Sequence, residues 1–268
     1  MKFTKMCGAG NDFIILENFD EKWTEDELSA LAKKLCQRHF SVGADGMMVL
    51  QKPLAGGDCR MLFFNNDGSL AEMCGNGARC LCRYCVERGL SKGNPKIETA
   101  AGMVTGERIS ENQYRIELNT PSCIELDKKT EKDPFDYLVL GEDGIPHAVI
   151  SVNFYTPIDK LREKARGLRN HPALPKGANV NCFDLWAENE IRLMTYERGV
   201  EDFTLACGTG AGATVAALTL RGLVSGKGTR VHTQGGVLTV DVLEEGQYPR
   251  IFLTGPAEIT YEGFLPEE

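Results

Sequence analysis

Two kinds of hydrophobic pattern run through this chain. Short β-prone runs, such as residues 61–64 and 191–196, predict strands. Residues 76–88 suit a helix that Gly89 can end, because glycine readily adopts the left-handed conformation that closes a helix. Residues 209–221 are almost all Ala, Gly, Thr, Val and Leu. A helix without a polar face has to be buried on all sides. The pattern therefore predicts a mixed α/β protein in which this helix is fully buried.

The pattern of the first half returns in the second. The segment Met-Cys-Gly-Asn-Gly-Ala at residues 73–78 recurs as Ala-Cys-Gly-Thr-Gly-Ala at residues 206–211. The flanking segments also match in the same order and at nearly constant spacing: residues 60–65 with 192–197, 97–104 with 231–238, and 115–121 with 250–256. Chance does not produce several motifs in one order at one spacing. We therefore interpret the chain as two homologous halves, each a full domain.

Each half contains a strand, a Cys-Gly turn, a helix, a strand and a hairpin. We expect an α/β (α+β) fold of two pseudo-symmetric domains, each a curved and mostly antiparallel sheet wrapped around a central helix. The charge-rich residues 123–136 are expected to lie between the domains. The predicted domains are residues 1–121 with Cys74, completed by a C-terminal strand at 257–268, and residues 122–256 with Cys207.

Composition narrows the function classes. In 268 residues, 30 Lys and Arg against 38 Asp and Glu give a net charge of −8, and no basic stripe suited to nucleic acid is present. No window approaches 18 apolar residues, and the N-terminus lacks the apolar core of a signal peptide. We expect a cytoplasmic protein with no membrane or nucleic-acid partner. Its ten cysteines should be reduced, and most of them buried.

A cysteine followed by Gly-x-Gly at the start of a helix has a specific chemical meaning. The glycines let the backbone turn tightly, while the first N–H groups and the helix dipole attract an anion and lower the pKa of a nearby thiol. Two such elements could place the sulfurs of Cys74 and Cys207 on opposite sides of one substrate, in a cleft between the domains. This suits inversion at a carbon bearing a proton, because one thiolate removes the proton and the other thiol supplies one to the opposite face.

Other interpretations of the cysteines are open. Both could be buried packing residues, although the duplicated context favours chemistry. Cys7 lies in a similar Cys-Gly-Ala-Gly segment outside the repeat, and we expect it to be non-catalytic. The close spacing of Cys74, Cys80, Cys82 and Cys85 suggests metal binding as an alternative. On a helix, however, Cys80 and Cys82 point about 200° apart, and the spacing matches no standard zinc signature, so we expect no metal.

Five segments together resemble the diaminopimelate epimerase family. They are residues 3–13, 64–69, 73–79, 197–200 and 206–211. The likeness extends over nearly the whole chain, and the two cysteine motifs in this order are specific. It implies a cytoplasmic isomerase that needs no cofactor, converts LL- to meso-diaminopimelate, and serves lysine and peptidoglycan biosynthesis. Its partner would be a small amino-acid substrate, and a homodimer is left open.

The resemblance also assigns roles to residues. Cys74 and Cys207 match the two acid/base cysteines. His147 matches the family histidine near the first thiol, and Glu197 lies similarly near the second. Arg198 would pair with a carboxylate through its planar guanidinium, although it could instead cap a sheet edge, and His147 could merely fix a turn. The implied substrate contacts are Asn11, Asn65, Asn179, Glu197 and Arg198, and the implied backbone donors are Gly75, Asn76, Gly208 and Thr209.

Three positions depart from the family pattern. Relatives usually have Asn, a contact to the distal end of the substrate, where this chain has Ile145. Phe203 stands where an acidic residue is expected, and Cys7 where a polar residue is common. None of them touches the two-thiol machinery. Ile145 keeps open a related racemase independent of pyridoxal phosphate, for example one acting on histidine. A non-enzymatic metal-thiolate or redox-sensing protein is the remaining alternative.

Overall fold

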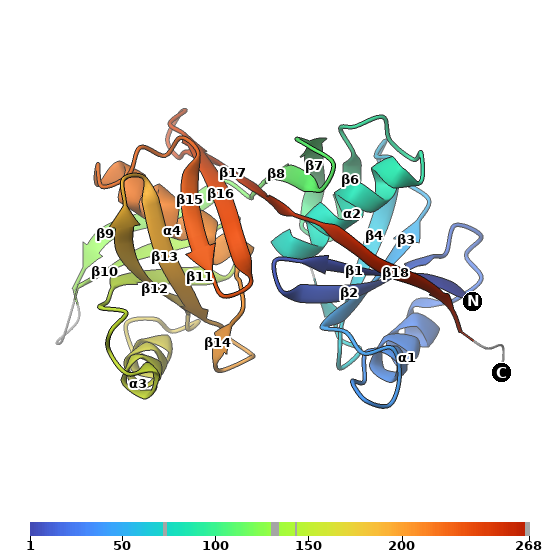
Figure 1. Cartoon of the computed structure of the whole chain (residues 1–268), viewed down its shortest axis with the longest axis horizontal. Helices are drawn as coiled ribbons and strands as arrows, with labels where there is room; N and C mark the ends of the chain where they lie inside the picture. Colours follow the sequence, from blue (N-terminus) through green and yellow to red (C-terminus); the bar gives the residue numbers. More distant parts are fainter. Residues whose placement is uncertain (72–73, 130–133, 143, 266–268) are drawn as a thin grey trace. The chain divides into compact units, whose positions relative to one another are not determined.

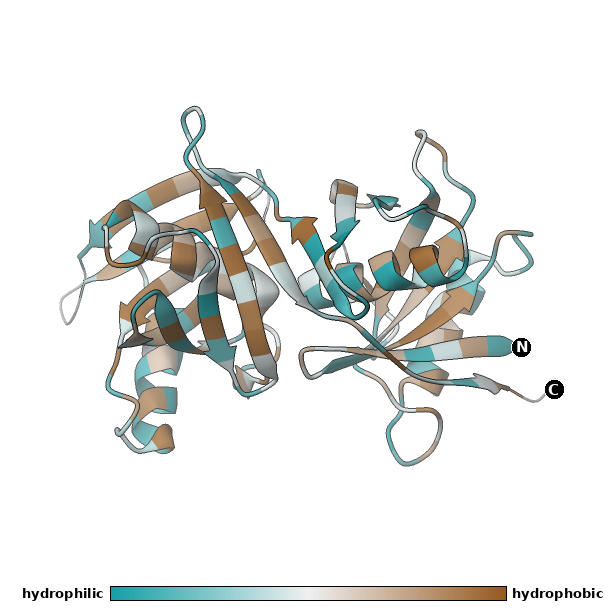
Figure 2. Ribbon diagram, turned by 45° about the horizontal axis from the view of Figure 1, so that its top comes forward, coloured by the Kyte–Doolittle hydropathy of each residue, from teal (hydrophilic) through white to brown (hydrophobic). Residues whose placement is uncertain are grey.

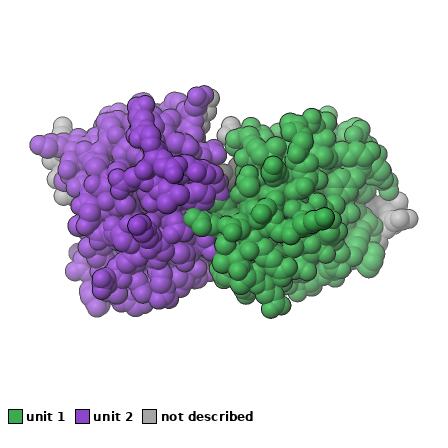
Figure 3. Space-filling model, turned by 90° about the horizontal axis from the view of Figure 1, so that it is seen from above, with its two compact units in different colours: residues 1–116, 255–268 green, residues 117–254 purple. Residues whose placement is uncertain are grey.

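The computed structural model describes residues 1–71, 74–129, 134–142 and 144–265. These residues form four helices and eighteen strands, which confirms the mixed α/β class (Figure 1). The chain divides into two compact units (Figure 3): unit 1 is Met1–Ile116 with Gly255–Glu268, and unit 2 is Glu117–Thr254. No helix within the described ranges is long and apolar enough to cross a membrane.

Unit 1 begins with a hairpin, and the last strand of the chain pairs with its first strand. Downstream of the hairpin, β3 runs parallel to β2, β4 runs antiparallel to β3, and β6 runs parallel to β4. Its elements are β1 (Lys2–Gly8), β2 (Asn11–Glu17), α1 (Glu25–Leu35), β3 (Gly46–Gln51), β4 (Cys59–Asn65), β5 (Leu70–Ala71), α2 (Gly75–Glu87), β6 (Lys96–Thr99), β7 (Gly102–Arg108), β8 (Gln113–Glu117) and β18 (Glu258–Phe264).

Unit 2 follows the same order of pairings. β12 runs parallel to β11, β13 runs antiparallel to β12, and β15 runs parallel to β13. The helices α2 and α4 therefore occur at the same point in the order of elements of the two units. Its elements are β9 (Pro121–Lys128), β10 (Phe135–Leu140), β11 (Pro146–Ser151), α3 (Ile158–Arg169), β12 (Asn179–Ala187), β13 (Glu190–Tyr196), β14 (Phe203–Thr204), α4 (Gly208–Leu220), β15 (Thr229–Thr233), β16 (Gly236–Leu243) and β17 (Arg250–Pro256).

The expectation that residues 123–136 lie between the domains is wrong. Residues 121–128 form β9, which pairs with β10 inside unit 2. Most side chains of β9 are at least partly exposed, and Lys128 forms an ion pair with Glu125 on its surface. An exposed strand has the same charged composition as a linker, so composition could not distinguish them. Residues 130–133 of this stretch lie outside the described residues.

The helix without a polar face is buried, as its composition predicts. α4 covers Gly208–Leu220, and every residue from 210 to 218 is buried. Strands β10, β11, β12 and β16 pack against it. In β16 and β17, buried and partly exposed residues alternate, and hydropathy alternates along the strands of Figure 2 in the same way. In unit 1, α2 packs against β1, β2, β7 and β18 and ends before Gly89, whose φ of 71° closes it as predicted.

The start of α2 is packed closely against β1. A Cβ on Gly8 would lie 2.8 Å from the carbonyl oxygen of Asn76 and 3.0 Å from Sγ of Cys80. Only a residue without a side chain allows the first turn of the helix to approach the strand this closely. Gly8 therefore sets the position of the helix that follows Cys74.

We expect Gly8→Ala to lower the free energy of unfolding by about 1–3 kcal/mol, because the added methyl group has to displace the backbone of α2. Gly167→Ala is the matched control. Gly167 is exposed in α3, and a Cβ added there would meet nothing within 4 Å, so the higher helix propensity of alanine should raise stability by up to about 1 kcal/mol. Urea denaturation of the three proteins measures both changes. Equal effects of the two substitutions would contradict the packing argument.

Candidate active site

The helices α2 and α4 begin at the two cysteines of the repeat. Cys74 precedes α2 with φ −130° and ψ 122°, and Cys207 precedes α4 with φ −117° and ψ 111°. Each of these carbonyls accepts the first helical hydrogen bond, from Ala78 at 2.8 Å and from Ala211 at 2.9 Å. The two cysteines therefore have the same extended backbone conformation, and their thiols lie at the positive ends of two helix dipoles.

The first turns of both helices present backbone donors. Gly75 and Asn76 open α2, and Gly208 and Thr209 open α4. N–H groups in a first turn have no acceptor within the helix. Neither first turn carries an acidic side chain that would compete for them. The residues expected to donate to a carboxylate thus occupy a helix start of the kind that binds anions.

Hydrogen-bond donors surround the thiol of Cys207. Its Sγ accepts from the N–H of Gly210 at 3.4 Å and lies 3.5 Å from Oγ1 of Thr209. Nδ2 of Asn179 is 3.9 Å from the same sulfur. Donors stabilise a negative charge on sulfur more than they stabilise a neutral thiol. The surroundings of Cys207 are therefore suited to a thiolate that forms and disappears during a reaction.

In unit 1, Asn11 and Asn65 lie at one edge of the sheet. The strand register aligns Phe13, Gly46 and Asn65 across β2, β3 and β4. Asn11 begins β2 and Asn65 ends β4, so both belong to this edge. Asn11 is joined to the start of α2, because Nδ2 of Asn76 donates to its Oδ1 at 2.6 Å. The structure thus brings Asn11 to the helix that follows the first cysteine.

In unit 2, the matching edge carries His147, Asn179 and Glu197. His147 lies opposite Asn179 in the parallel pair of β11 and β12. Glu197 directly follows β13 and accepts a hydrogen bond from Oγ1 of Thr204. Oδ1 of Asn179 accepts from the backbone N–H of Arg198 at 2.8 Å. One sheet edge and the turn that follows it therefore hold these predicted residues together.

His147 is held as a neutral imidazole. Its side chain is 1% exposed, and burial lowers its pKa to about 3, with a smaller contribution from the positive charge of Arg198. Nδ1 lies 3.3 Å from Nδ2 of Asn181, whose Oδ1 accepts from Oγ1 of Thr195 at 2.9 Å. An amide nitrogen can only donate, so Nδ1 is the acceptor and the hydrogen-bond network assigns the ring proton to Nε2.

Asn181 and Thr195 are functional candidates that the sequence reasoning missed. The signal was present, because Asn179 and Asn181 are two residues apart on a strand and therefore face the same side. A Cβ on Gly210 would lie 2.3 Å from Oδ1 of Asn181 and 2.9 Å from Oγ1 of Thr195. The second glycine of the Cys-Gly-x-Gly motif in unit 2 thus makes room for the amide that orients His147.

Three other predicted positions have plain structural surroundings. Ile145 is 41% exposed just before β11. Phe203 packs edge-on against Tyr196, with ring centroids 5.8 Å apart, beside the hydrophobic cluster of unit 2. Arg198 is exposed, and its Nη1 donates to the carbonyl of Lys176 at 2.9 Å. Phe203 therefore has a packing role that needs no ligand.

The cysteines of α2 face different neighbours. Cys80 faces Gly8 on β1, whereas Cys82 faces Gly106 on β7. Sγ of Cys85 lies 3.5 Å from Sγ of Cys59. Across the residues that the structure describes, no group of three or more His, Cys, Asp or Glu side chains is arranged to hold a metal ion.

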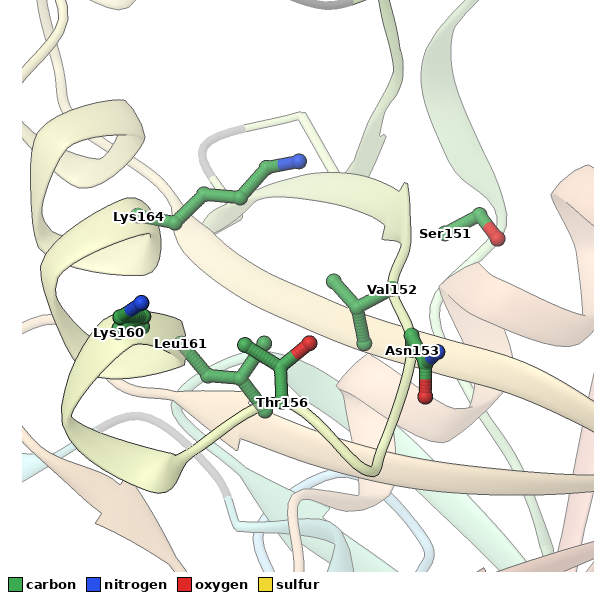
Figure 4. Close-up of a pocket in the computed structure, with 7 residues that line it drawn as sticks. All are labelled: Ser151, Val152, Asn153, Thr156, Lys160, Leu161 and Lys164. Atoms are coloured by element: carbon green, nitrogen blue, oxygen red, sulfur yellow. The ribbon is translucent and has the colours of Figure 1, made fainter.

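A cavity of about 590 Å³ opens beside α3 in unit 2 (Figure 4). Ser151, which lines the cavity, ends β11, whereas His147 lies at the beginning of the same strand. The cavity is therefore separated from the edge that carries the predicted site. Its lining consists of Ser151, Val152, Asn153, Thr156, Lys160, Leu161 and Lys164.

Comparisons with known proteins match both halves. The family model of diaminopimelate epimerase matches residues 3–123 and again residues 140–260. Diaminopimelate epimerase from Aquifex aeolicus is 39% identical over 279 residues, covering 100% of this chain and 99% of the relative. That from Methanocella arvoryzae is 38% identical over 275 residues, covering 98% and 96%. A solved structure of a probable proline racemase from Agrobacterium radiobacter is 16% identical, covers 100% of this chain and 93% of its own, and shares the fold with a TM-score of 0.70.

The buried, neutral His147 should make stability fall in mild acid. Its pKa is about 3 in the folded chain against 6.5 as the ordinary value, so between these values the unfolded chain binds the proton and the folded chain does not. The contribution of this group to stability is complete above pH 6.5 and declines as the pH falls, by about 2 kcal/mol from pH 7 to pH 5. Urea denaturation of the wild type and His147→Gln at both pH values isolates the effect. An equal pH dependence in the two proteins would contradict a buried neutral imidazole.

Proposed function

We infer the function of this chain from its family: the chain belongs to the diaminopimelate epimerase family. It is accordingly an isomerase that interconverts LL- and meso-diaminopimelate, a step of lysine biosynthesis that also supplies peptidoglycan. We place it in the cytoplasm and take its partner to be this small amino acid. The two compact units would be copies of one ancestral domain, each a curved sheet around a central helix, α2 in one and α4 in the other.

One observation supports the mechanism we propose. Two helices, one in each unit, start from a cysteine with the same extended backbone and the same Gly-x-Gly first turn. In our mechanism the thiolate of one cysteine takes the α-proton from one face of the substrate carbon. The thiol of the other gives its proton to the opposite face. The enzyme then holds the proton on the first sulfur and the charge on the second, so each form serves one direction.

The remaining residues would stabilise and orient the reacting groups. The first-turn N–H groups of α2 and α4 would bind the α-carboxylate, whose negative charge grows as the carbon is deprotonated. The neutral His147 would assist Cys74 by donating its Nε2–H to the sulfur, and Glu197 would assist Cys207 by accepting or returning the thiol proton. Asn11, Asn65, Asn179 and Arg198 would hold the substrate. No cofactor is required, because the helix starts stabilise the carbanion.

Each cysteine should be indispensable. We expect Cys74→Ala and Cys207→Ala to reduce the conversion of LL- to meso-diaminopimelate by at least about 100-fold, because one face loses its proton donor or acceptor. Cys7→Ala is the matched control and should retain activity within about twofold of the wild type. Chiral chromatography of the reaction mixture measures the rate of conversion in each variant. Near-normal turnover in either of the first two variants would contradict the two-thiol mechanism. A higher kcat/KM for L-histidine than for diaminopimelate would contradict the proposed substrate.

Hydrogen isotopes distinguish two bases from one. When the reaction starts from a single stereoisomer in D2O, the product should carry deuterium at the inverted carbon from its first appearance, because the donating thiol has exchanged with solvent. Substrate recovered early should carry little deuterium. Mass spectrometry of both stereoisomers at low conversion makes the measurement. Product that keeps the original proton would indicate one base acting on both faces.

A further inference from the structure

Arg79 is a buried cation in the helix that begins after Cys74. Its side chain is 0% exposed, and among the described residues the groups that act electrostatically on it are cysteines and not carboxylates. Burial lowers its pKa, yet a guanidinium remains protonated in proteins. A buried charge is costly unless something compensates it. The position is also unfavourable in itself, since a positive charge lies near the positive end of α2.

Arg79 starts a chain of hydrogen bonds that leads to Asn11. Its Nη2 donates to Oδ1 of Asn76 at 2.8 Å, and its Nη1 lies 3.4 Å from the carbonyl oxygen of Gly75. Nδ2 of Asn76 then donates to Oδ1 of Asn11 at 2.6 Å, and Nδ2 of Asn11 donates to Oδ2 of Asp45 at 3.0 Å. The chain thus runs from a cation, through two amides, to a carboxylate.

The two ends of this chain determine how both amides are turned. A guanidinium can only donate hydrogen bonds, and an ionised carboxylate can only accept them. Oδ1 of Asn76 must therefore face Arg79, and Nδ2 of Asn11 must face Asp45. One of the two amide protons of Asn11 is used by Asp45, so the same nitrogen can donate its other proton to an anion. Arg79 thus acts together with Asp45 to fix the orientation of Asn11, an amide that Arg79 does not touch.

The charge of Arg79 acts on the thiols around it. Cys74, Cys80 and Cys82 all lie within electrostatic reach of the guanidinium. Cys80 and Cys82 are fully buried, and burial raises the pKa of Cys82 to about 12 and that of Cys80 further still, so both remain thiols despite the nearby charge. Cys74 is only partly buried. Among these three sulfurs, Cys74 is the one on which a negative charge can form.

The other half of the repeat has no cation at the equivalent position. The position equivalent to Arg79 is Gly212 in α4, and a Cβ there would lie 2.4 Å from Cδ1 of Leu118. No longer side chain fits without moving Leu118. The sulfur of Cys207 instead accepts from the backbone of Gly210. The chain therefore contains its own comparison, a cysteine at a helix start with a buried arginine and one without.

We propose that Arg79 is the positioning residue of the first half-site: it orients Asn11 through Asn76, and its charge stabilises the thiolate of Cys74. The inference rests on the proposed function only in taking Cys74 and Asn11 as reacting and binding groups. In this arrangement the negative charge that compensates the buried cation is the thiolate itself. The two cysteines then reach their ionised forms by different means, Cys74 through a cation and Cys207 through neutral donors.

Alkylation of the full-length protein by iodoacetamide tests the charge. Peptide mass spectrometry follows Cys74 and Cys207 in the same sample at a series of pH values. In Arg79→Met we expect alkylation of Cys74 near pH 7 to slow by about tenfold, as for a pKa higher by one unit, and its pH midpoint to rise. Cys207 should stay within about twofold of the wild type. Arg83→Met is the matched control on the same helix, because Arg83 is already paired with Glu258 at 3.1 Å, and should leave both rates unchanged.

Arg79→Lys separates the two roles and is the safer variant for folding. It keeps the charge but loses the planar pair of donors. Alkylation of Cys74 should then remain within about threefold of the wild type, while KM for diaminopimelate rises at least about fivefold with a smaller change in kcat, because Asn11 is no longer oriented. Unchanged Cys74 reactivity in Arg79→Met, or equal slowing of both cysteines, would overturn the proposal. The alkylation rates do not depend on turnover, so they can fail while the two-thiol reaction stands.

Discussion

The proposed site depends on the N–H groups at the starts of two helices. At the start of α1, side chains satisfy two backbone N–H groups: Thr24 accepts from the backbone of Glu27, and the carboxylate of Glu27 accepts from the backbone of Thr24 at 2.8 Å. The starts of α2 and α4 have a cysteine at the same position, followed by glycine. Sulfur is a weak acceptor and glycine adds no side chain. These two first turns also carry no acidic side chain, so they are better suited to an external anion than the first turn of α1, which contains Glu25, Asp26 and Glu27.

A helix start binds an anion well only when it is held rigidly, and glycines at contacts provide this. Gly8 lets β1 touch the first turn of α2, and Gly210 lets the first turn of α4 touch the buried pair Asn181 and Thr195. In both units the groups around the helix come from the beginnings of two parallel strands and the end of an antiparallel one. Strand ends in a sheet have defined positions, so polar side chains placed there need little reorganisation when substrate binds.

The sequence predicted those parts of the molecule that depend on local pattern. The strand at 191–196, the buried helix near 209–221 and the glycine that ends α2 follow from periodicity and backbone preference, which neighbouring residues decide. The expectation for residues 123–136 was wrong because composition does not reveal that residues 123–128 pair with β10. Asn181 and Arg79 were overlooked for a related reason. Their importance lies in burial and in hydrogen bonds to residues that packing brings close, such as His147 and Asn76.

The two halves have similar backbones around their cysteines but different charges there. The proposed reaction explains why these charges can differ. The proposed two-thiol inversion would alternate the charge between the sulfurs, so each helix start would have to stabilise a thiolate in one form of the enzyme and tolerate a thiol in the other. In the first half, Arg79 supplies a fixed positive charge, which Asn76 and the carbonyl of Gly75 partly offset when the sulfur is neutral. In the second, neutral donors around Cys207 serve both states, and the neighbouring His147 remains uncharged. A duplicated backbone can thus be kept while each copy balances its own charge.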